Sequence, residues 1–208
     1  MKSLIKTVFV IFVFLVFSCK KRGYLINELR SDNNRKIFNL ENTESNYLIY
    51  TEDFMDESWS KFHVKVRNNA TLDPNGNPTA DLVDFSEDIS NSRISQVVDN
   101  LPEGYYAFSI YLKALKGDIG KFIISVKSRG NKEEWRNRSI KIEDSHWKRV
   151  DVRIKLDSVG SIVIYPGNRL VNGSDKSLKR IYMWGAQLEK INSISSELKK
   201  YKGVKVIK

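Results

Sequence analysis

Residues 104–114 read GYYAFSIYLKA and carry the clearest indication of the fold. Its even-numbered positions carry Tyr106, Phe108, Ile110 and Leu112, and its odd-numbered positions carry Tyr105, Ala107, Ser109 and Lys113. Because successive side chains of a β-strand point to opposite faces, this alternation predicts a strand with one buried face and one exposed face. Residues 149–156, RVDVRIKL, repeat the pattern with charged side chains at every second position.

Short runs of this kind extend through most of the chain. The predicted strands are 47–51, 63–67, 80–85, 92–98, 104–114, 121–128, 139–143, 147–156, 161–165 and 180–188. Segments rich in Gly, Pro, Asn and Asp separate them, such as DPNG at 73–76 and PGN at 166–168, and these residues favour chain reversals. Half-buried strands of this length predict an all-β domain of two antiparallel sheets that share one core.

The first 18 residues have the features of a secretory signal peptide. Lys2 and Lys6 precede an unbroken apolar run at 8–17. Ten apolar residues are too few to span the ~30 Å hydrocarbon layer as a helix, but they fit the apolar centre of a signal peptide. An uncleaved N-terminal membrane anchor is the alternative that the sequence leaves open.

The end of this segment indicates a class of exported protein. Val16-Phe17-Ser18-Cys19 resembles the lipobox of bacterial lipoproteins. The resemblance implies cleavage before Cys19, a diacylglycerol thioether on its sulfur, and acylation of its new amino group by a fatty acid such as palmitate. Residues 19–45 are then the lipidated cysteine and a polar tether. Lys20 follows the cysteine where inner-membrane retention signals resemble Cys-Asp, so we expect the outer membrane. No acidic cluster follows Cys19, so we expect the periplasmic side rather than the cell surface.

Charge and cysteine content limit the function further. The chain carries a net charge of +10, with basic clusters in 20–36 and in the C-terminal tail 191–208. Such clusters attract anionic lipid, nucleic acid or acidic glycans. For an exported, membrane-tethered protein we expect no nucleic-acid partner. Cys19 is the only cysteine, so the domain has no internal disulfide and must be stabilised by its core.

Five motifs in order resemble one family of jelly-roll modules. Residues 46–54, NYLIYTEDF, with Trp59 after them, are similar to its opening N-L-L-x-x-S-E-D-F…W, and 182–189, YMWGAQLE, to its closing W-G-A-Q-L-E. Its intermediate motifs match residues 79–81 (TAD), 108–114 (FSIYLKA) and 147–150 (WKRV). These modules are described as carbohydrate-binding-like, with a galactose-binding-like fold. The resemblance covers 46–190 and implies a jelly-roll β-sandwich there.

The tryptophans are the candidate ligand residues, because glycan recognition uses aromatic rings against the C–H faces of sugars and polar groups on the hydroxyls. Trp147 and Trp184 lie within predicted strands, and we expect them in the core with Phe108, Ile110, Val150 and Val152. Trp135 lies among charges and amides in 131–138, NKEEWRNR, which predicts a loop. We expect it to bind a glycan, including an anionic one, with Arg136, Asn137 and Arg138. Two alternatives stay open: Trp135 as a ring packed on the sheet edge, and Trp59 as either a second platform or a lid on the core.

Nothing in the sequence predicts catalysis. His63 and His146 lie far apart, and no G-x-S-x-G motif occurs. We expect no cofactor except a structural calcium ion, which jelly rolls of this kind often hold. Glu52, Asp53 and Glu189 offer the hard oxygen ligands that calcium prefers. Two functions therefore compete: a non-catalytic lipoprotein of the cell envelope that binds a glycan, and a structural or protein-interaction lipoprotein of an envelope assembly with no sugar ligand.

Overall fold

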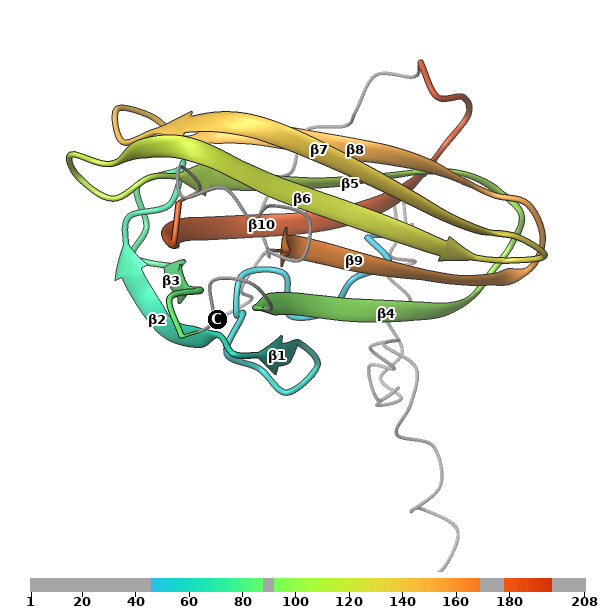
Figure 1. Cartoon of the computed structure of the whole chain (residues 1–208), viewed down its shortest axis with the longest axis horizontal. Coiled ribbons are helices and arrows are strands. Elements are labelled where there is room, and N and C mark those ends of the chain that lie inside the picture. The colour runs from blue at the N-terminus through green and yellow to red at the C-terminus, as the bar shows by residue number, and fades with distance from the viewer. Residues whose placement is uncertain (1–45, 88–91, 169–177, 196–208) are drawn as a thin grey trace, which may run out of the picture. The chain divides into compact units, whose positions relative to one another are not determined.

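Antiparallel strands build the part of the chain that the computed structural model describes, residues 46–87, 92–168 and 178–195 (Figure 1). They are β1 (Ser60–Phe62), β2 (Lys65–Thr71), β3 (Ala80–Asp84), β4 (Arg93–Leu101), β5 (Gly104–Lys113), β6 (Ile119–Arg129), β7 (Glu133–Glu143), β8 (Lys148–Leu156), β9 (Gly160–Asn168) and β10 (Arg180–Ile191). The predicted signal peptide, Cys19, the tether and residues 196–208 of the tail lie outside the described residues. Among the described residues no helix is long and apolar enough to cross a membrane.

The strands form two five-stranded sheets. Sheet A has the order β1-β4-β9-β6-β7, and sheet B has the order β2-β3-β10-β5-β8. Several connections cross between the sheets, because β4 and β9 belong to sheet A while their successors β5 and β10 belong to sheet B (Figure 1). The described part is therefore an all-β, two-sheet antiparallel jelly-roll sandwich, as predicted.

The core between the sheets follows the alternation seen in the sequence. Phe108 and Ile110 of β5 face Val152 and Val150 of β8, and all four side chains are buried in one continuous cluster. Burial of each such side chain contributes roughly 1.5–3 kcal/mol. The opposite face of β5 is also shielded from solvent, because Ala107 is as deeply buried as Phe108. The prediction that this face of β5 is exposed is therefore wrong at the centre of the strand.

Trp147 and Trp184 lie outside the space between the sheets, contrary to the prediction. Trp184 pairs with Tyr111, an odd-numbered residue of β5 that points away from the core. It is buried there in a second small cluster with Ala80, Tyr111 and Trp147. The Trp184 indole Nε1 donates a 3.0 Å hydrogen bond to Thr79 Oγ1. The β-bulge after Trp184 and the positive φ of 64° at Gly185 interrupt the register of β10, which sequence periodicity could not reveal.

The predicted strands 47–51 and 139–143 also differ from the structure. Residues 47–51 form bends rather than a strand, although the Tyr47 N–H donates to Leu188 O and the Ala186 N–H donates to Thr51 O. Strand β7 begins at Glu133, six residues before the predicted strand 139–143. The second difference moves the candidate Trp135 from a loop onto a regular strand.

Candidate functional site

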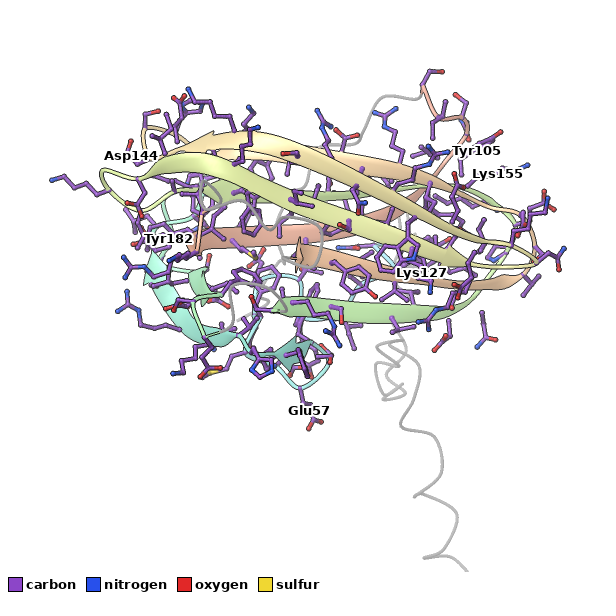
Figure 2. All side chains as sticks on the ribbon, viewed as in Figure 1. Glu57, Tyr105, Lys127, Asp144, Lys155 and Tyr182 are labelled. Atoms are coloured by element: carbon purple, nitrogen blue, oxygen red, sulfur yellow. The ribbon has the colours of Figure 1, made fainter. Side chains whose placement is uncertain are left out.

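Strand β7 presents Trp135 on the outer face of sheet A. Trp135 is paired with Lys127 of β6, and Asn137 is paired with Ser125. Ile124 and Val126, which alternate with Ser125 and Lys127 along β6, belong to the core. The side chains of Ser125 and Lys127 therefore point away from it. Trp135 and Asn137 therefore share the outer face, with Lys127 on the side of sheet A turned toward the viewer (Figure 2).

A second aromatic ring supports Trp135. Tyr165 of β9 is paired with Ser125 on the other side of β6, and its ring stacks on Trp135 with 5.3 Å between centroids and 22° between planes. Trp135 is 43% exposed, whereas Tyr165 and Ser125 are buried. We call the Trp135–Tyr165 pair the aromatic platform: an exposed indole fixed by a buried ring, on the central and edge strands of one sheet.

Lys127 completes the local geometry of the platform. Its Nζ lies 5.3 Å from the centroid of the Trp135 ring and 2.7 Å from Glu133 Oε2. Arg129 Nε lies 3.8 Å from Glu133 Oε1. Next to these groups the outer face continues with uncharged side chains, since Val163 of β9 pairs with both Lys127 and Val97 of β4.

Arg136 and Arg138 do not join the platform, contrary to the prediction. Strand alternation turns them away from Trp135, toward the open edge between the two sheets. Arg136 forms an ion pair with Glu134, and Arg138 forms one with Asp151 of β8. Since β7 is the edge of sheet A and β8 the edge of sheet B, the Arg138–Asp151 ion pair links the edges of the two sheets. Asp151 also pairs with Arg153 at 3.0 Å. Of the predicted set, the structure places only Trp135 and Asn137 on one surface.

Trp59 is part of the core, and its prediction as a second platform is wrong. Its side chain is 1% exposed and packs on Phe54, with 4.9 Å between ring centroids. The indole Nε1 donates a 2.9 Å hydrogen bond to Tyr50 O. Of the two alternatives the core position is the correct one: Trp59 immediately precedes β1 and packs into the main core.

Two of the predicted calcium ligands line a hollow of about 190 Å³ near β2 and β3. Its lining residues are Glu52, Asp53, Asn68, Asn69, Thr79 and Asp81. The carboxylate of Asp81 accepts hydrogen bonds from the N–H groups of Phe54 (2.8 Å) and Asn69 (2.9 Å). Burial, with a contribution from nearby Asp53, raises the pKa of Asp81 to about 6. These oxygens thus hold the backbone of two segments together.

The third predicted calcium ligand, Glu189, is not among the residues that line this hollow. It lies on β10, opposite Ala107 of β5. Across residues 46–87, 92–168 and 178–195, no three His, Cys, Asp or Glu side chains are grouped so that they could hold a metal ion. The predicted ligand set therefore does not fit calcium as it stands, and calcium binding stays a prediction.

Comparison with known proteins supports the fold. No protein-family model matches the chain, and no curated protein matches it in sequence. Among solved structures it is similar to a xylan-binding domain from carbohydrate-binding module family 22, with 13% identity, 74% of this chain and 99% of that chain covered, and a TM-score of 0.52. It is also similar to the C-terminal family 22 carbohydrate-binding module of Clostridium thermocellum Xyn10B. That comparison has 12% sequence identity, covers 72% of this chain and 96% of that chain, and has a TM-score of 0.52. At this identity the likeness shows the fold alone, the jelly roll of carbohydrate-binding modules.

Three residues of this surface, Tyr165, Lys127 and Glu133, were not among the ligand residues predicted from the sequence. The parity of strand 161–165 places Tyr165 on the face opposite Ile164, which was a usable signal. The pairing of β6 with both β7 and β9, which brings the two rings together, is a long-range contact with no local signature.

Proposed function

We propose that this chain is a non-catalytic lipoprotein of the cell envelope whose jelly roll binds a glycan on the outer face of sheet A. The observation that carries the proposal is the stacking of the exposed Trp135 ring on the buried Tyr165 ring. An aromatic face in a fixed orientation suits the apolar C–H surface of a sugar ring. Because little side-chain freedom remains to be lost on binding, a supported ring binds better than a mobile one.

Polar groups next to the platform can bind the hydroxyls of the sugar. Asn137 lies two residues from Trp135 on the same face of β7 and supplies both a donor and an acceptor. Ser139 follows at the next outward position, paired with Ile123 of β6. An apolar ring beside a few amide and hydroxyl groups is the usual composition of a sugar-binding surface.

The membrane anchor belongs to the same proposal and is supported by sequence. The apolar run at 8–17 and the lipobox-like residues that end at Cys19 support export and lipidation. Two or more acyl chains on one residue give stable membrane attachment. We propose the periplasmic side of the outer membrane as the location of the anchored domain.

The experiment is a calorimetric titration of oligosaccharides into the full-length chain and into Trp135→Ala. We expect the variant to bind about 5- to 150-fold more weakly, since loss of a stacking ring costs about 1–3 kcal/mol in the comparable case of nucleobases. Leu72→Ala, which trims another exposed apolar side chain distant in sequence, is the matched control and should bind as the parent does. Equal affinity in Trp135→Ala, or no binding by the parent chain, would leave the protein-interaction function as the better one.

A further inference from the structure

Three charged side chains lie next to the platform on the outer face of sheet A, and they form ion pairs with one another. Lys127 Nζ approaches one carboxylate oxygen of Glu133 at 2.7 Å, and Arg129 Nε approaches the other at 3.8 Å. Both oxygens of Glu133 therefore face cations. The cations nearest to Trp135 are held by a carboxylate of the protein itself.

Lys127 is the cation that a sugar on the platform would meet. Its side chain is only 14% exposed and its Nζ lies 5.3 Å from the centroid of the Trp135 ring. Glu133 lies two positions before Trp135 on the same outward face of β7, and its side chain is 57% exposed. A negatively charged sugar that approached Lys127 would therefore also approach the carboxylate of Glu133.

Two other cations of this strand, Arg136 and Arg138, lie on its opposite side, whereas Lys141 lies on the outward face farther along β7 and forms an ion pair with Glu143. Arg136 pairs with Glu134, and Arg138 pairs with Asp151 across the open edge. The outward neighbours of the ring toward β4 are Val163 and Val97, which carry no charge. Lys127, which is paired with Glu133, is therefore the described cation that lies against the Trp135 ring.

We propose that Glu133 makes the aromatic platform selective for neutral over acidic sugars, by neutralising Lys127 and repelling a sugar carboxylate. This inference rests on the proposed function and assigns its ligand class. It replaces the anionic glycan predicted from sequence, because that prediction assumed that Arg136 and Arg138 shared a surface with Trp135. A neutral sugar needs only the ring face and uncharged hydrogen-bonding groups such as Asn137.

The test compares Glu133→Gln with the parent chain, both full length. Gln keeps the size of the side chain and removes its charge, so Lys127 becomes available to an anion. The probes are neutral gluco-, xylo- and galacto-oligosaccharides and, as the acidic ligand, oligogalacturonate. We expect the parent chain to bind a neutral probe, and Glu133→Gln to bind that probe within about twofold of it. We expect the variant to bind oligogalacturonate about fivefold more tightly than the parent does at low salt, which is the scale of one exposed ion pair.

The gain should disappear as salt is raised, because exposed charges are screened over about 8–10 Å at ordinary ionic strength. Glu134→Gln is the control, since Glu134 pairs with Arg136 on the other side of β7. That variant should bind every probe as the parent does. Unchanged thermal melting shows that the variants are folded.

Two outcomes separate this inference from the function on which it rests. If the parent chain binds oligogalacturonate more tightly than neutral probes, or if Glu133→Gln shows no gain for the acidic probe, the selectivity is wrong while glycan binding stands. If the parent binds none of the probes, the proposed function fails and the selectivity fails with it.

Discussion

The ring of Trp135 on β7 stacks on the ring of Tyr165 on β9, although the whole of strand β6 lies between their strands. Tyr165 is paired directly with Ser125 of β6, and Trp135 lies diagonally to Ser125, so the two rings meet next to a buried, small side chain. A larger residue at 125 would occupy the space where they meet. Three strands that are distant in sequence thus fix one exposed ring.

This relationship predicts that Tyr165 acts through Trp135. Tyr165→Leu keeps an apolar side chain but removes the stacked ring, whose contribution to such a pair is about 0.5–1.5 kcal/mol. We expect glycan affinity to fall by about 2- to 10-fold, less than in Trp135→Ala. Calorimetry measures the affinity, and the fluorescence of Trp135 reports its changed surroundings. A variant with the affinity of the parent chain would show that the buried ring does not position the exposed one.

Much of the fold could be predicted because its strands carry a local signal. Phe108 and Ile110 alternate with Ala107 and Ser109, and that period of two fixes both the strand and its buried face. Trp184 shows the limit of this reasoning. A bulge beside Gly185 interrupts the period, and the ring packs on the outer face of sheet B instead of between the sheets.

The platform was predictable only in part, for two physical reasons. The charges of 131–138 indicated a loop, but edge strands of sheets commonly carry charged side chains, and β7 is the edge of sheet A. The residue type of Trp135 therefore indicated a ligand residue, whereas its charged neighbours led to the wrong prediction of a loop. Tyr165 and Glu133 gain their roles from strand register, which depends on contacts between β6, β7 and β9.

Truncation of Trp59 should destabilise the domain far more than truncation of Trp135. Trp59 is fully packed against Phe54, so Trp59→Ala should lower the free energy of unfolding by about 3–5 kcal/mol. Trp135→Ala removes a half-exposed ring and should cost about 1 kcal/mol or less. Urea unfolding followed by circular dichroism measures both. Equal losses of stability in the two variants would contradict these assignments.

The anchor prediction concerns Cys19 alone. Cys19→Ala removes the sulfur that a diacylglycerol would modify, so the variant should leave the membrane fraction or accumulate with its signal peptide uncleaved. Metabolic labelling with a clickable fatty acid, followed by gel electrophoresis, distinguishes lipidated from unlipidated chain. Label retained by the variant would show that the lipid is attached elsewhere. Ser18→Ala keeps a small residue before the cysteine and is the control expected to be labelled normally.

Asp81 should make the stability of the domain depend on pH. Its pKa is raised to about 6 in the folded chain, because it is buried and faces Asp53, while an unfolded Asp has a pKa of about 3.9. Between these values the folded state binds more protons than the unfolded state, so the contribution of Asp81 to stability falls as pH rises. It is fully present below about pH 4 and is lost above about pH 6. Acidification through this window therefore stabilises the chain at this site.

The measurement is the free energy of unfolding of the parent chain and of Asp81→Asn, by urea titration at about pH 4.5, 5.5 and 7. Asn cannot ionise and keeps only one acceptor oxygen for the N–H groups of Phe54 and Asn69, so we expect the variant to be less stable throughout. The stability advantage of the parent should shrink on the order of 1–2 kcal/mol from the lowest to the highest pH. Asp99→Asn, at an exposed position of β4, is the control for the loss of one carboxylate outside this hollow. An advantage of Asp81 that stays constant or grows with pH would show that this carboxyl is ionised throughout the range.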